Sequence, residues 1–70
     1  MSAIEFKSSE GMSDREFLRG YWGLVLPIWQ AFQKGAIGAS RRDEELRPHR
    51  DRLTRITART TEAQRREMVA

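Results

Sequence analysis

The chain has 70 residues, no cysteine, one histidine and a net charge of +3. These values exclude a disulfide-stabilised fold and a thiolate metal site, and His49 alone, with no cluster of carboxylates beside it, does not make a zinc site. A core of this size rarely supplies more than about 3–5 kcal/mol without disulfides, a metal or a partner subunit. Association with another chain is therefore the expected source of further stability, and no cofactor is expected.

Composition also gives expectations about location and origin. The N-terminus has neither the basic nor the apolar region of a secretory signal. The longest uncharged run, residues 20–33, is 14 residues long, which is shorter than the roughly 20 needed to span a bilayer. We therefore expect a cytoplasmic protein with no transmembrane segment. Eleven arginines against two lysines are typical of a GC-rich genome, which indicates a bacterial or phage origin.

Residues 1–12 show no helical periodicity and contain Ser8, Ser9 and Gly11. Residues 3–7 alternate like a strand, but an isolated strand of this length has nothing to pair with. We expect a flexible N-terminal arm ahead of a single helical domain over residues 13–70. The alternative is that Ile4 and Phe6 fold back onto apolar surface or add to a partner.

The first predicted helix covers residues 14–34 and has clear ends. Ser13 is a suitable N-cap, and Glu16 three residues later completes a capping box. Lys34 lies in the last turn, and Gly35 stands where a left-handed residue usually ends a helix.

A second helix is predicted over residues 41–60, antiparallel to the first because the connection over residues 35–39 is short. Ser40 is its expected N-cap, with Asp43 three residues later. One face of this helix carries a narrow stripe at helical spacing. The stripe consists of Leu46, His49, Leu53, Ile56 and Thr60.

Two prolines lie inside the predicted helices. Pro27 removes one hydrogen bond and crowds the carbonyl of Gly23, so it should kink the first helix. The bend either fits a partner or is a tolerated local kink. Pro48 either disturbs the second helix or divides it. After that helix, Thr61 with Gln64 forms a weak capping box, which is followed by a short third helix over 62–68 or by a frayed tail.

The apolar face of the first helix is broader than the second helix can cover. Each large apolar side chain left in water forgoes about 1.5–3 kcal/mol, so several exposed ones would exceed the stability of the domain. We therefore predict an all-α fold, an antiparallel helical hairpin that pairs into a homodimeric four-helix bundle. The residues expected in the core or dimer face are Phe17, Leu18, Tyr21, Leu24, Val25, Ile28, Phe32, Leu46, Leu53 and Ile56.

Nine arginines lie between residues 41 and 66, interleaved with acids. Asp43 with Arg47, Asp51 with Arg55 and Glu62 with Arg66 are spaced for i,i+4 ion pairs. Three of the nine arginines also project together as one basic ridge. The ridge consists of Arg52, Arg55 and Arg59. It is either a solvated face, a contact for an acidic protein surface, or a nucleic-acid contact.

No catalytic residues are predicted, because His49 has no nucleophile or second histidine beside it. We interpret His49 as a packed histidine of the apolar stripe, with pH sensing as the alternative. The leading functional hypothesis is a non-enzymatic protein-binding inhibitor or modulator of a bacterial host protein. Its alternatives are a nucleic-acid-binding accessory protein and a membrane-surface amphipathic protein. The expected protein-binding residues are Trp22, Leu26, Trp29, Arg52, Arg55 and Arg59, since Trp and Arg dominate interface hot spots.

Overall fold

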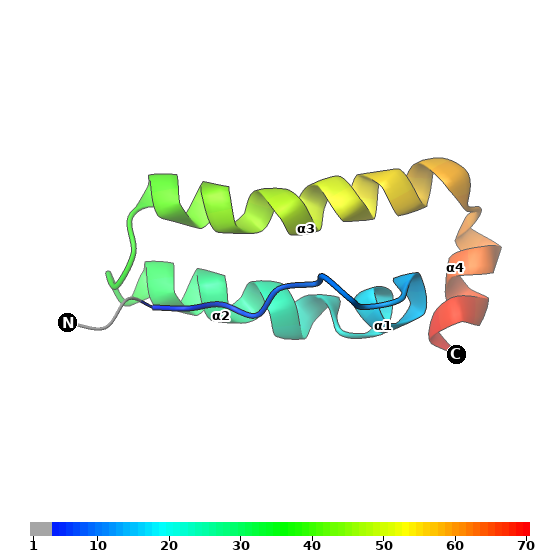
Figure 1. The fold of residues 1–70 in the computed structure, drawn as a ribbon, viewed down its shortest axis with the longest axis horizontal. Helices are drawn as coiled ribbons and strands as arrows, with labels where there is room; N and C mark the ends of the chain where they lie inside the picture. The colour runs from blue at the N-terminus through cyan, green and yellow to red at the C-terminus, as the bar shows by residue number, and fades with distance from the viewer. Residues whose placement is uncertain (1–3) are drawn as a thin grey trace.

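The computed structural model describes residues 4–70, in which every regular element is a helix. α2 and α3 lie side by side and run in opposite directions, while α4 turns back across the end of the pair beside α1 (Figure 1). The all-helical class that the sequence predicts is confirmed for these residues. The elements are α1 (Asp14–Arg19), α2 (Tyr21–Gln33), α3 (Ala39–Arg59) and α4 (Glu62–Val69).

The first predicted helix is interrupted at Gly20. Its start is as predicted: the Ser13 hydroxyl accepts from the Glu16 N–H, and the Glu16 carboxylate accepts from the Ser13 N–H. Gly20 has φ −101° and ψ 9°, in the bridge region next to the helical one, and a Cβ atom at this position would lie only 3.2 Å from the Glu16 carbonyl oxygen. The prediction of one continuous helix over residues 14–34 was therefore wrong. Pro27, in contrast, lies inside α2 and does not end it.

The end of α2 is a Schellman motif, as the position of Gly35 indicates. Gly35 has φ +77°, its N–H donates to the Phe32 carbonyl at 3.0 Å, and the Ala36 N–H donates to the Ala31 carbonyl at 2.9 Å. These bonds satisfy carbonyls that the helix leaves without partners. The same turn carries Ile37 into the core, where it is 8% exposed.

α3 begins two residues earlier than predicted. Gly38, in an extended conformation, is the N-cap, and Ser40 lies inside the first turn. The prediction of Ser40 as the cap was wrong because the Gly38 carbonyl already accepts from the Arg42 N–H at 3.0 Å. Pro48 lies inside α3 and does not divide it. The weak capping box of Thr61 and Gln64 is present at the start of α4.

The core consists of two apolar clusters along the α2–α3 pair. One lies near the turn and contains Val25, Ile28, Ile37 and Leu46. The other lies near α1 and contains Phe17, Leu24 and Ile56. Six of the ten predicted core residues are thus buried, and the sequence analysis missed Ile37. The other four predicted core residues are half-buried against these clusters: Leu18, Tyr21, Phe32 and Leu53.

The N-terminal segment covers part of the apolar face of α2 that α3 leaves uncovered. Residues 4–12 run along α2 (Figure 1). Phe6 packs against the cluster near the turn, and Met12 packs against the cluster near α1. Ser9 is buried between these two contacts. The first three residues of the predicted arm lie outside the described residues.

His49 is enclosed in the apolar stripe of α3. It is 4% exposed, its ring is stacked on Phe17 with centroids 6.4 Å apart, and its Nδ1 atom has no hydrogen-bond partner within residues 4–70. Burial lowers the pKa of His49, and the negative charge of Glu45 opposes that shift in part. The imidazole is therefore neutral in the folded protein near pH 7.

We expect acid to destabilise the fold through His49. The unfolded state, with a pKa of about 6.5, takes up a proton first, so stability is complete above about pH 6.5 and declines as pH falls toward the lower folded pKa. The test is urea unfolding at about pH 7.5 and about pH 5.5, above the range in which carboxylates titrate. His49→Gln should lose less stability than the wild type between these two values. Equal losses would contradict the assignment to His49.

Candidate functional site

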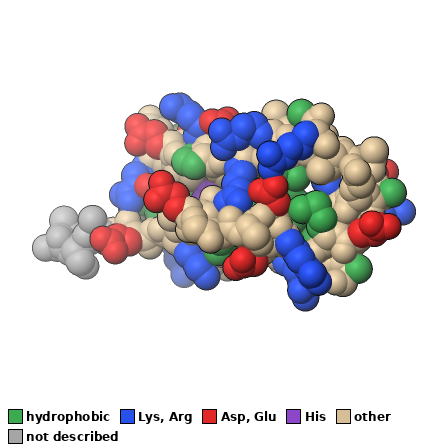
Figure 2. Space-filling view, turned by 45° about the vertical axis from the view of Figure 1, so that its right-hand side comes forward, with side chains coloured by type: hydrophobic (Ala, Val, Ile, Leu, Met, Phe, Trp, Pro, Cys, Tyr) green, Lys and Arg blue, Asp and Glu red, His purple; other side chains and the backbone are tan. Residues whose placement is uncertain are grey.

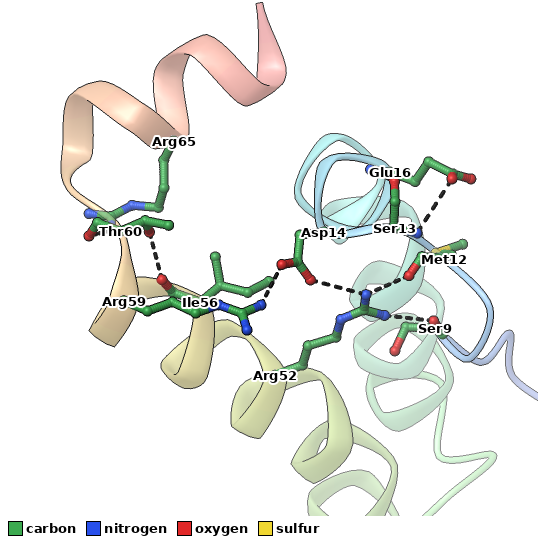
Figure 3. Close-up of polar contacts among 10 residues, drawn as sticks. All are labelled: Ser9, Met12, Ser13, Asp14, Glu16, Arg52, Ile56, Arg59, Thr60 and Arg65. Carbon is green, nitrogen blue, oxygen red and sulfur yellow. Dashed lines mark hydrogen bonds and ion pairs between the residues drawn. The ribbon is translucent and has the colours of Figure 1, made fainter.

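Arg52 of α3 joins the N-terminal segment to the helices (Figure 3). Its Nη1 donates to the Ser9 carbonyl at 2.7 Å, and its Nη2 donates to the Met12 carbonyl at 2.5 Å. The guanidinium also lies over the Phe17 ring, 4.9 Å from the centroid. A planar cation with several fixed donors suits this combination of carbonyls and an aromatic face. Arg52 therefore acts within the fold, with its side chain 19% exposed.

Asp14 receives two arginines of α3. Its Oδ1 atom lies 3.3 Å from Arg52 Nη2, and its Oδ2 atom pairs with Arg59 (Figure 3). Its place in the first turn of α1 suits the positive end of that helix as well. This contact was not predicted from the sequence, although Arg52 and Arg59 are seven residues apart and so share one face of α3. The predicted basic ridge is thereby divided: Arg55 is the member that is exposed and has no ion pair within residues 4–70.

Two further arginines cover aromatic side chains at the other end of the molecule. Arg42 lies 4.4 Å from the Phe32 centroid and 5.2 Å from the Trp29 centroid. Arg41 lies 5.7 Å from the Phe6 centroid and donates to the Ile4 carbonyl at 2.5 Å. Trp29, a predicted protein-binding residue, is consequently half-buried and packs against the core.

The largest exposed apolar side chain belongs to Trp22, at 71% exposure, and Leu26 one turn later is 47% exposed. Within residues 4–70, the Trp22 ring has one aromatic neighbour, Tyr21, with centroids 6.1 Å apart. Both side chains lie on the side of α2 opposite its buried residues Leu24, Val25 and Ile28, which we call the outer face. Its residues along α2 and at the C-cap are all exposed: Trp22, Gly23, Leu26, Pro27, Gln30, Gln33 and Lys34.

Outside the outer face, positive and negative side chains are interspersed on the surface. Figure 2 shows lysine, arginine and acidic side chains side by side over the visible face. Of the three predicted i,i+4 pairs, the described residues form Glu62 with Arg66, at 2.7 Å. Asp43 pairs with its neighbour Arg42 instead. A nucleic-acid-binding face usually carries a more uniform positive field than this.

A shallow hollow of about 460 Å³ lies between the N-terminal segment and α3. Three arginines and two acids line it together, so it offers no strong field of one sign. Its lining residues are Ser9, Glu10, Arg47, Pro48, Asp51, Arg52 and Arg55. Among residues 4–70 no three His, Cys, Asp or Glu side chains are grouped to hold a metal. Nor does this part of the chain contain a helix with the length and apolar character needed to cross a bilayer.

Comparison of the chain with known protein families, with curated proteins and with solved structures gave no significant match.

We expect Arg52→Gln to destabilise the fold by about 1.5–3 kcal/mol, because it leaves the Ser9 and Met12 carbonyls without their charged donor and leaves Asp14 with Arg59 alone. Arg55→Gln is the matched control, one turn away on the surface, and should change stability by less than about 0.5 kcal/mol. Urea unfolding measures both, and amide hydrogen exchange of residues 4–12 should accelerate in Arg52→Gln alone. Equal stability of the two variants would contradict the role of Arg52.

Proposed function

We propose that this chain is a small non-enzymatic protein-binding module that inhibits or modulates another protein, in a bacterial or phage setting, and that it binds through the outer face of α2. The observation that carries the proposal is the 71% exposure of Trp22 on a helix held by the core. An indole in water forgoes about 1.5–3 kcal/mol of burial free energy, which a partner would recover. Tryptophan is also the residue type most enriched at energetic hot spots.

The proposal gives His49 a structural role. Its ring lies beneath the surface against Phe17, so a substrate has no access to it. Catalysis by a general base needs such a group within hydrogen-bond reach of the reacting atom.

The homodimer stays a prediction. The side chains expected at its face pack within one chain against α3, residues 4–12 and Ile37. The apolar excess that motivated the four-helix bundle is therefore smaller than the sequence suggested. A dimer would have to use surface outside the two clusters.

Nucleic-acid binding through Arg52, Arg55 and Arg59 is less favoured. Arg52 donates to backbone carbonyls of the N-terminal segment, and Asp14 compensates both Arg52 and Arg59. Phosphate binding would have to displace these contacts. Protein binding through Trp22 and Leu26 requires no such rearrangement.

We expect Trp22→Ala to reduce partner capture by at least tenfold, about 1.4 kcal/mol, when the tagged full chain is used as bait in a lysate of its native host. Val69→Ala is the matched control, because Val69 is also an exposed apolar residue, 41% exposed, but lies on α4. Both variants should keep the wild-type circular dichroism.

Undiminished capture by Trp22→Ala would contradict the proposal. Loss of helicity in that variant would instead assign Trp22 a role in folding, and Leu26→Ala, with its smaller truncation on the same face, then decides the matter. Light scattering on the same samples gives the oligomeric state.

A further inference from the structure

The outer face of α2 carries no negative charge, and the charged residues nearest to this helix in the chain are cations. No Asp or Glu occurs in the sequence between Glu16 and Asp43, and α2 lies entirely within that stretch. Arg19, in the last turn of α1 and one turn after Glu16, precedes α2, and Lys34 is its C-cap. Both cations are exposed, and neither forms an ion pair within residues 4–70. This contrasts with α3, where acids and arginines alternate.

The exposed apolar side chains are too few to form a stable interface by themselves. A tryptophan buries at most about 250 Å², whereas each partner in a stable complex buries about 800 Å². An interface centred on Trp22 and Leu26 must therefore extend along the helix. It then reaches Arg19 in one direction and Lys34 in the other, so the partner has to accommodate both cations.

A second copy of this chain fits that requirement poorly. If two outer faces met in antiparallel orientation about Leu26, Arg19 of each copy would approach Lys34 of the other. In parallel orientation each cation would approach its own counterpart. Like charges placed opposite one another across an interface are unfavourable.

A lipid surface fits poorly for a different reason. A helix that lies in a membrane interface presents a continuous apolar face to the lipid. The apolar face of α2 is instead packed in the core through Leu24, Val25 and Ile28. Only Trp22 and Leu26 remain exposed on this helix as large apolar side chains.

Resting on the proposed function, we infer that the outer face binds an acidic amphipathic helix of a partner protein. Apolar side chains of that helix would pack on Trp22 and Leu26, and its carboxylates would pair with Arg19 and Lys34. A helix suits the face because Trp22 and Leu26 repeat at one-turn spacing along α2, and a helix laid beside it carries its own side chains at the same repeat.

The test uses a fluorescein-labelled synthetic peptide about five turns long, with leucines on one face of its central turns and glutamates on the same face in its first and last turns. The same peptide with lysines in place of the glutamates is the control ligand. Fluorescence anisotropy should show that the full chain binds the glutamate peptide, that added salt weakens this binding, and that the lysine peptide does not bind. Arg19→Glu should weaken binding by about three- to tenfold.

The matched control variant is Arg50→Glu, which makes the same change in net charge at an exposed position of α3. Its binding should change by less than about twofold. Equal losses in the two variants, or no binding of the glutamate peptide, would overturn the inference. A light-scattering dimer without peptide binding would assign the face to a second copy. Binding to phosphatidylglycerol vesicles without peptide binding would assign it to a membrane surface.

These outcomes are separable from the proposed function. If Trp22→Ala abolishes capture of the cellular partner while the glutamate peptide fails to bind, the chain is a protein-binding module whose partner has a different chemistry. If both experiments fail, the outer face is not a binding surface.

Discussion

The fold depends on the guanidinium of Arg52, which holds a segment without regular secondary structure against a helix pair. α3 has one narrow apolar stripe, and α2 has an apolar face that this stripe cannot cover alone. The Arg52 bonds to the Ser9 and Met12 carbonyls position the N-terminal segment so that Phe6 and Met12 supply additional cover. Asp14 compensates the charge of Arg52 and connects α1 to α3 (Figure 3). A chain without disulfides thereby closes its core with its own residues.

Once the core is closed in this way, the exposed apolar surface of α2 reduces to Trp22 and Leu26. Arg42 adds to the effect at the other end, since it covers Trp29 and Phe32. The two tryptophans therefore have different roles, which the sequence analysis did not distinguish. Trp29 belongs to the edge of the core, and Trp22 is exposed on the outer face.

Features that depend on neighbouring residues could be predicted. The capping box of Ser13 and Glu16, the left-handed Gly35 and the stripe of Leu46, His49 and Ile56 all follow from spacing within one helix. Features that depend on distant residues could not. The contacts of Arg52 with Ser9 and Met12 join positions about forty apart in the chain, and propensity contains no information about them. The interruption at Gly20 was missed because glycine permits a break without requiring one. Serine is a favoured N-cap residue, so Ser40 was predicted as the cap of α3, but the helix begins two residues earlier and Gly38 takes that position.

The most direct test of this account is acrylamide quenching of tryptophan fluorescence in two single-tryptophan variants. Trp29→Phe reports on Trp22, and Trp22→Phe reports on Trp29. The account predicts that Trp22 is quenched readily and emits at long wavelength in the isolated protein at low concentration, whereas Trp29 is quenched less and emits at shorter wavelength. A Trp22 that is as protected as Trp29 under these conditions would contradict it, because the outer face would then be covered before any partner is added.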